Sequence, residues 1–304
     1  MFRAAPVRLQ VPATSANLGP AFDAAGLALS LVDDVYAQVA DSGLDVDVAG
    51  EGAEDVRRDE RHLVVKSMRA AFKEMGGQPR GLVLRCLNRI PHGRGLGSSA
   101  AAIVAGILAA RELTVGGADR LPDEAVLELA TSIEGHPDNV AACISGGFTL
   151  AWTEGGRPYV LRLDVNRAII PVVLVPSTAV STKKARGLLP ETVPHRDAAA
   201  SAGRAALLTA AMTTTPALLL SATEDRLHQS YRAPAMPRSA SLVEKLRAEG
   251  IAAVISGAGP TVLTLTDAET ADRVVAMAPK GWVGHRLTVE PRGAAVMPLD
   301  VRSG

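Results

Sequence analysis

The sequence predicts an α+β protein built as two lobes, and three observations support this fold class. Segments with strand and helix patterns alternate along the 304 residues, without internal repeats or low-complexity tracts. Hydrophobic residues make up 47% of the chain, which at this length is enough to bury the cores of two modest domains. The stretch "TEGGRP", Thr153 to Pro158, marks a change of character and is the predicted boundary. The predicted domains are therefore residues 1–153 and 154–304.

The first predicted domain opens on a half-buried strand, because Val7, Leu9 and Val11 alternate with polar residues. The run 100–110 has apolar residues on every side, which is typical of a buried helix, here beginning near Ser98. The remaining predicted elements are strands at 45–48, 81–90 and 148–152 and helices at 62–75 and 122–135, the last closed by Gly135.

The second predicted domain contains an uncharged segment, residues 205–223, of nearly membrane-spanning length. Pro216 interrupts this segment, so the sequence favours a buried helix ending near Thr213 and a second helix starting around Pro216. The remaining predicted elements are strands at 169–176, 251–255, 262–265 and 287–289 and helices at 241–249 and 268–277.

The charges of the chain balance, because 32 Lys and Arg residues stand against 32 Asp and Glu residues. This balance gives no electrostatic reason to expect a nucleic-acid or membrane partner. The two cysteines, Cys86 and Cys143, lie in apolar settings without metal-ligand spacing, which favours buried reduced thiols. The start "MFRAAPVRLQ" lacks the apolar segment of a secretory signal, so a cytoplasmic location is expected.

The stretch "PHGRGLGSSAA", Pro91 to Ala101, places three glycines at alternate positions before a helix start. Glycine-rich backbone leading into a helix N-terminus favours an anion site, above all a phosphate site. The alternative is a tight turn with Ser98 as an ordinary N-cap, which one glycine would serve. The familiar nucleotide loops do not fit, since no lysine follows the glycines and their spacing is G-x-G-x-G.

Three further short motifs complete an ordered set: "PATSANLGPAFD" at 12–23, "EGHPDNVAA" at 134–142 and "SGAGPTV" at 256–262. With "PHGRGLGSSAA", this set resembles the GHMP kinases, which phosphorylate galactose, homoserine, mevalonate and phosphomevalonate. The first motif and the "EGHPDN" form are most similar to the branch that acts on homoserine. The resemblance implies a GHMP kinase fold, with an N-terminal ribosomal S5 domain 2-like lobe that binds ATP and a C-terminal ferredoxin-like lobe.

The resemblance also implies ATP and Mg²⁺ as cofactors, with Ser99 and Glu134 attending the metal. Magnesium usually takes only one or two protein ligands, and a carboxylate such as Glu134 at a helix C-terminus needs a compensating positive charge. Arg94 either helps to neutralise phosphate or faces solvent. The residues expected to bind the nucleotide are Pro91, His92, Gly93, Arg94, Gly95, Leu96, Gly97, Ser98, Ser99, Ala100 and Ala101.

The "GHPDN" segment offers a candidate for proton transfer. Asp138 either takes the substrate proton as a general base or caps a helix beginning at Asn139, and direct transfer without a base is equally consistent. His136 is expected near the substrate, although a lone histidine is more often structural.

Homoserine presents a carboxylate, an ammonium group and a hydroxyl group. By resemblance, Asn17 and Asp23 hold the amino acid, with Asp23 suited to the ammonium group. Arg186 and Arg232 match the arginines expected at the carboxylate, which the arginine fork can bind through two hydrogen bonds. His62 departs from the family, which tends to have asparagine there beside the adenine pocket.

The sequence therefore predicts ATP-dependent phosphorylation of L-homoserine to O-phospho-L-homoserine, on the route to threonine. A kinase of mevalonate or a sugar is the main alternative, but those substrates would leave Asp23 and the two arginines unexplained. A catalytically silent nucleotide sensor predicts loss of the metal ligands, and a nicotinamide oxidoreductase is disfavoured by the glycine spacing. A homodimer is the assembly considered, although the sequence itself defines no oligomeric state.

Overall fold

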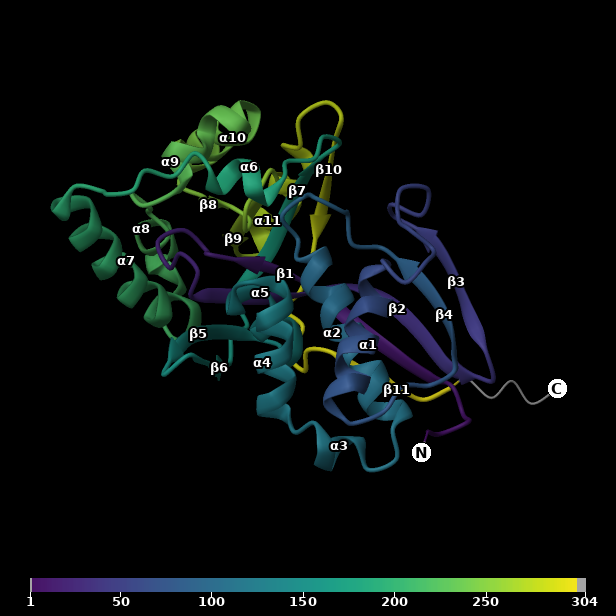
Figure 1. The fold of residues 1–304 in the computed structure, drawn as a ribbon. Helices are drawn as coiled ribbons and strands as arrows, with labels where there is room; N and C mark the ends of the chain where they lie inside the picture. The colour runs from purple at the N-terminus through teal and green to yellow at the C-terminus, as the bar shows by residue number, and fades with distance from the viewer. Residues whose placement is uncertain (1, 300–304) are drawn as a thin grey trace.

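A computed structural model describes residues 2–299, which form two lobes built on two β-sheets (Figure 1). The first sheet is seven-stranded, in the order β11-β1-β2-β4-β3, with β2 also pairing with β5 and β5 with β6. Only β3 and β4 pair in parallel, and helix α1 makes the crossover that such a pair requires. The strands are β1 (Val7–Ala16), β2 (Ala25–Ala40), β3 (Gly43–Gly50), β4 (Gly81–Asn88), β5 (Phe148–Glu154), β6 (Arg157–Leu163) and β11 (Ala295–Met297).

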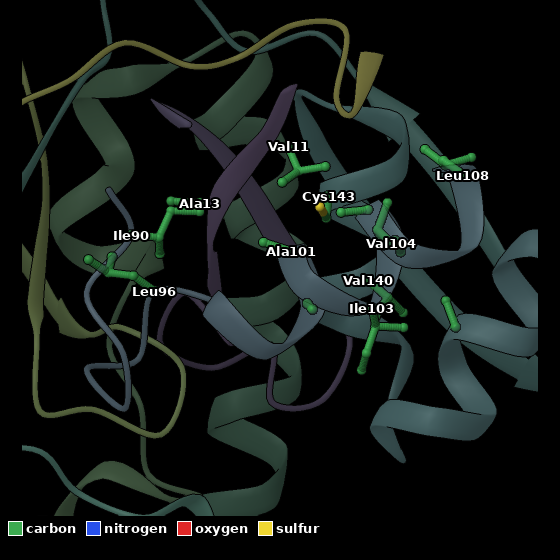
Figure 2. Packing of buried hydrophobic residues seen from close by; sticks show 14 of the residues in the cluster. Val11, Ala13, Ile90, Leu96, Ala101, Ile103, Val104, Leu108, Val140 and Cys143 are labelled. Carbon is green, nitrogen blue, oxygen red and sulfur yellow. The ribbon is translucent and has the colours of Figure 1, made fainter. Parts of the chain in front are cut away.

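Helix α2 (Ser98–Leu113) lies at the centre of the first lobe, with α1 (Leu63–Glu74), α4 (Asp123–Glu134) and α5 (Pro137–Ser145) around it and the short α3 (Gly117–Arg120) after it. It is apolar on all sides because α1, α4, α5 and strand β1 all pack against it. Gly106 permits the close approach of α1, since a Cβ there would overlap the carbonyl oxygen of Val64. Figure 2 shows α2 side chains such as Val104 beside Cys143 of α5, and Ile90 and Leu96 grouped with Ala13 near the loop that enters α2.

The second sheet is four-stranded and antiparallel, in the order β10-β7-β9-β8. Its strands and its two packed helices follow the order β7-α10-β8-β9-α11-β10, which is the ferredoxin-like arrangement. The elements are β7 (Ile170–Pro176), α10 (Pro237–Ala248), β8 (Ala252–Ile255), β9 (Val262–Thr266), α11 (Ala268–Ala276) and β10 (Trp282–Arg286), with α6 (Thr182–Arg186), α7 (His195–Thr213), η1 (Pro216–Leu218), α8 (Leu219–Ala222), α9 (Gln229–Arg232) and η2 (Ala233–Ala235) between β7 and α10.

The two lobes share a core on one face of the second sheet, which is buried on both faces. Val172 and Leu174 of β7 pack with residues of the second lobe's own helices. Val173 and Val175 point to the opposite face and join the large core that includes α2. This burial on both sides accounts for the continuous apolar run at 169–176.

The predicted boundary at Thr153–Pro158 is not where the chain leaves the first sheet. These residues close the hairpin β5–β6, whose two-residue turn has positive φ at Gly155 (58°) and Gly156 (81°), as the favoured hairpin turns require. The chain leaves the first sheet after Leu163. Strand β11 then returns from the C-terminal end to pair with β1. The division into residues 1–153 and 154–304 stays a prediction.

Most predicted elements are present with shifted ends, two predictions need correction, and strands β2, β6 and β11 were not predicted. Residues 287–289 form no regular strand, because only Val289 makes an isolated bridge, to Leu29. Helix α10 begins at Pro237, one turn before the predicted start. The helix break at Pro216 is confirmed, and within residues 2–299 no helix has the length and apolar character needed to cross a membrane.

Candidate active site

The loop between β4 and α2 has a backbone conformation that depends on its three glycines. Gly93, Gly95 and Gly97 all lie in the left-handed region, with φ of 64°, 77° and 69°, which other residues rarely adopt. Gly97 occupies the N-cap position of α2, and no side chain bonds to the helix start. The alternative with Ser98 as N-cap is therefore wrong. The first N–H groups of α2 are left for an anion.

Close contacts with two other motifs explain two of these glycines. The hydroxyl group of Ser256 donates to the Gly95 carbonyl oxygen at 2.6 Å, and a Cβ on Gly95 would overlap the Ser256 carbonyl oxygen. A Cβ on Gly97 would overlap the hydroxyl oxygen of Thr14. The backbone N–H of Thr14 in turn donates to Leu96. Motifs from both lobes therefore meet around one loop.

A cavity of about 480 Å³ lies where these motifs meet. Most of the predicted site residues line it, while Pro91, Ala100 and Asp23 do not, although Asp23 contacts a lining residue. The predicted residues in its wall are Asn17, His92, Gly93, Arg94, Gly95, Leu96, Gly97, Ser98, Ser99, Ala101, Glu134, His136, Asp138, Arg186 and Arg232.

Arg94 is half-buried in the cavity wall and is held by backbone carbonyl oxygens. Its guanidinium group donates to the backbone carbonyl oxygens of His92 (2.6 Å), Pro176 (3.1 Å) and Ser177 (2.5 Å). The side chain therefore fastens the loop to the end of β7, and its expected role toward phosphate stays a prediction.

Ser99 and Glu134 are brought together from two helices. The Ser99 hydroxyl group, in the first turn of α2, donates to Glu134 Oε1 at 2.6 Å. Glu134 is the last residue of α4, whose final turn has no basic side chain to balance the carboxylate. A hydroxyl and a carboxylate oxygen are ligands of the kind that Mg²⁺ prefers, so these residues fit the predicted metal. Within residues 2–299 no cluster of three or more His, Cys, Asp or Glu residues suits a metal, as expected for an ion with few protein ligands.

Asp138 is held firmly at the start of α5 and is only 2% exposed. Its Oδ1 accepts from His136 Nδ1 (2.6 Å) and from the backbone N–H of Asn139 (2.7 Å). The hydrogen bond to Asp138 raises the pKa of His136. Helix α5 begins at Pro137, with His136 at the N-cap position, and not at Asn139 as predicted.

Asn17 shapes the first motif through both ends of its amide. Its Nδ2 donates to the Gly257 carbonyl oxygen, and its Oδ1 accepts from the Asp23 backbone N–H, each at 2.9 Å. Asn17 and Asp23 both have positive φ, 71° and 55°. The residue therefore connects the two lobes and fixes the position of Asp23.

Asp23 and Arg186 form a bidentate ion pair across the lobes, with distances of 2.7 and 2.9 Å. Its hydrogen bonds raise the pKa of Arg186. Phe22, which sequence reasoning missed, lies beside both arginines, with its ring centre 5.5 Å from the Arg186 guanidinium carbon and 4.9 Å from that of Arg232.

Arg232 is a buried cation with few partners. It is 2% exposed, and burial lowers the pKa of its guanidinium group. Its Nη1 contacts His228 Nδ1 at 3.3 Å and the Gly257 carbonyl oxygen at 3.4 Å, while its Nε has no partner among residues 2–299. Burying a charge in this way is costly unless an anion completes the site.

Four valines form an apolar part of the cavity wall: Val11, Val35, Val56 and Val64. His62 lies at the N-cap position of α1, and its Nδ1 is buried without a partner among residues 2–299. Burial lowers the pKa of its imidazole.

Asp33 was also missed from the sequence. It accepts from the backbone N–H groups of Arg89 (2.6 Å) and Ile90 (2.9 Å) and so holds the chain that enters the glycine-rich loop. Burial raises the pKa of this carboxyl group to about 6.

The fold and the loop geometry together define a small-molecule kinase. Comparison with known proteins agrees, since the model of the GHMP kinases N terminal domain matches residues 62–147 and that of the GHMP kinases C terminal matches residues 198–284. Homoserine kinase of Streptomyces avermitilis is 65% identical over 298 residues, 98% of each chain. Homoserine kinase of Streptomyces coelicolor is 64% identical over 302 residues, 99% of this chain and 98% of the relative.

Solved structures point the same way. Homoserine kinase from Cytophaga hutchinsonii has a TM-score of 0.84 at 27% identity, over 98% of this chain and 99% of that one. Mevalonate kinase from L. major, at 18% identity and a TM-score of 0.68 over 96% of this chain and 99% of that one, shares the fold. The chain therefore belongs to the GHMP kinase family, within its homoserine kinase branch. The expected fold, an S5 domain 2-like lobe followed by a ferredoxin-like lobe, is confirmed.

Proposed function

We propose that this enzyme transfers the γ-phosphoryl group of ATP to the hydroxyl group of L-homoserine and produces O-phospho-L-homoserine. One observation carries the proposal: a buried, under-partnered arginine, Arg232, lines the same cavity as a glycine-rich phosphate loop. The site thus offers a place for a carboxylate and a place for a polyphosphate within one cavity. The close similarity to two homoserine kinases along nearly the whole chain supports this substrate.

Membership of the GHMP kinase family implies the use of ATP. We assign its phosphates to the N-terminus of α2, where unpaired N–H groups and the helix dipole favour negative charge. Ser99 and Glu134 are proposed to hold Mg²⁺, which when bound neutralises charge on the transferring phosphate. The adenine ring is assigned to the apolar part of the cavity wall, beside His62 and Val64.

We assign the acceptor hydroxyl group to the neighbourhood of Asp138 and His136, which line the same cavity as Ser99 and Glu134. Oδ1 of Asp138 is already contacted by three donors, so a role as general base falls to Oδ2. Direct transfer remains the second route, in which the site supplies only orientation and charge stabilisation.

Three charged side chains, Asp23, Arg186 and Arg232, match the zwitterion of homoserine, and we call the part of the site around them the substrate end. We assign the ammonium group of homoserine to Asp23 and its carboxylate to Arg186 and Arg232. The Asp23–Arg186 ion pair is formed without substrate. Each half of the substrate zwitterion therefore replaces one half of an existing pair, which limits the desolvation cost of binding.

The test is ADP release with a small panel of acceptors in the presence of Mg²⁺. L-homoserine is expected to support turnover with a kcat/KM at least about tenfold above that of mevalonate, galactose or L-serine, since only homoserine combines a zwitterion with the right hydroxyl position. A tenfold preference for mevalonate or galactose would overturn the substrate and leave only the family. The cytoplasmic location and the homodimer stay predictions.

A further inference from the structure

His228 is a fully buried histidine that no step of the proposed reaction uses. It lies at the start of α9, one helical turn before Arg232. Its Nε2 is 2.8 Å from the Gly19 carbonyl oxygen in the first motif, and its Nδ1 is 3.3 Å from Arg232 Nη1. Its ring stacks on Phe22, with 4.9 Å between ring centres and an angle of 28°. The imidazole thus bridges the first motif and Arg232.

These contacts define the protonation state of His228. A carbonyl oxygen can only accept, so Nε2 carries the proton, and a guanidinium group can only donate, so Nδ1 is a bare acceptor. The imidazole is therefore neutral and in one tautomer. Burial lowers its pKa, in agreement with this assignment.

Three charged groups face this imidazole. Arg232 opposes a second proton, whereas Asp225, whose Oδ2 is 3.7 Å from Nε2, and Asp23 favour it. The Asp225 carboxylate, however, already accepts from the backbone N–H groups of Leu227, His228 and Gln229. Burial and Arg232 thus keep His228 neutral.

The two arginines of the substrate end have partners of different charge. Arg186 is paired with a carboxylate, which cancels much of its charge. Arg232 instead meets a neutral nitrogen and a backbone carbonyl oxygen, which fix its Nη1 without cancelling its charge. Its Nε has no acceptor within the part of the chain that the structure describes. The guanidinium group is oriented and still fully charged.

We propose that His228 is a positioning residue for substrate recognition, which aligns Arg232 with the α-carboxylate of the amino-acid substrate through its neutral Nδ1. The inference rests on the proposed function, because it takes the anion at Arg232 to be the substrate carboxylate. It predicts that the atom facing Arg232, and not the one facing Gly19, sets the affinity for homoserine.

Two substitutions separate these atoms. His228→Asn keeps a polar atom near the Nδ1 position, whereas His228→Gln places its amide near the Nε2 position and removes the acceptor for Arg232. His228→Gln is expected to raise the KM for homoserine about tenfold, the effect of losing one hydrogen bond to a charged group, with little change in kcat or in the KM for ATP. His228→Asn is expected to recover most of this loss. The penalty in His228→Gln should nearly vanish with 3-aminopropan-1-ol, which is homoserine without its carboxylate.

Arg232→Ala tests the proposed contact with the substrate carboxylate separately from the role of His228. If Arg232→Ala raises the KM for 3-aminopropan-1-ol by the same factor as the KM for homoserine, the carboxylate does not contact Arg232 and the proposed binding mode is wrong. If Arg232→Ala impairs homoserine selectively but His228→Asn is as impaired as His228→Gln, the clamp stands and the role of His228 is refuted. Should either His228 variant fail to fold, ¹⁵N NMR of the parent enzyme decides. A protonated Nδ1 near neutral pH would overturn the proposal, and a bare Nδ1 whose resonance shifts on adding homoserine but not 3-aminopropan-1-ol would support it.

Discussion

Glu134 ends a helix with a charge that the helix dipole disfavours, and its nearest described partner is the hydroxyl group of Ser99. We expect Glu134→Gln to lower kcat by at least about a hundredfold, because it removes the charge that would bind the metal while keeping the shape. Steady-state rates over a range of Mg²⁺ concentrations measure this, and excess Mg²⁺ should restore part of the activity.

Glu124→Gln is the matched control for this prediction. Glu124 lies in the first turn of the same helix and is exposed, so its loss should leave turnover and the Mg²⁺ dependence unchanged. Near-normal turnover in Glu134→Gln would show that the metal is held by other groups.

Among single residues, the sequence indicated candidate ligands from their residue type and motif. It did not indicate residues whose role depends on a contact with a segment distant in the sequence. Ser99 and Glu134, predicted from motif and ligand type, lie within hydrogen-bond distance of each other, and their role at the metal stays a prediction. Asn17 was expected at the substrate, yet its amide holds the backbone of Gly257 and Asp23. His228 gave no signal because its partners, Gly19 and Arg232, are brought together only by the contact between lobes.

At the scale of the element, the glycine-rich loop combines an unusual backbone with a close contact. We expect Gly97→Ala to destabilise the protein by more than the about 1–2 kcal/mol of a left-handed alanine, because its Cβ would also overlap Thr14. ATP affinity should fall as well, since the start of α2 must move. Denaturant unfolding and nucleotide titration measure the two effects.

Gly116→Ala separates the two causes. Gly116 has the same φ of 69° and the same N-cap position, at α3, but the nearest atom to its Cβ, Asp119 Oδ2, is 3.9 Å away. It should therefore show the backbone cost alone and leave ATP binding intact. Equal losses of stability in the two variants would argue against a close contact at Gly97.

The prediction of elements was wrong where one sequence pattern is compatible with two structures. Strand β2 escaped notice because Asp33 and Asp34 interrupt its apolar pattern, although Asp33 is buried and paired with backbone N–H groups. The glycine pair at Gly155 and Gly156 indicates a turn, and the sequence alone does not distinguish a hairpin from a link between domains. Helix α2 was predicted well because its apolar pattern is continuous in the sequence. The end of α7 at Thr213 was predicted from Pro216, whereas its start at His195 lies upstream of the predicted segment and few of its residues are buried.

At the scale of the whole molecule, the shared core predicts that the two lobes unfold together. The chain has two tryptophans: Trp152 lies in the first sheet and is 46% exposed, and Trp282 lies buried in the second. With Trp152→Phe, fluorescence reports Trp282 alone, and its thermal midpoint should coincide with that from far-UV circular dichroism. Trp282→Phe gives the complementary probe of the first sheet. Within either variant, two separated transitions would mean that the core is divided between the lobes.

The return of the last strand has a consequence for how the protein is made. β11 pairs with β1, and Glu290 and Ala294 bond to backbone groups of the first lobe. A chain still emerging from the ribosome therefore exposes the outer edge of β1, an open strand edge of the kind that pairs with other chains, until the segment that carries β11 has been released. A pause in translation before that segment would prolong the exposure, and pairing of β11 ends it.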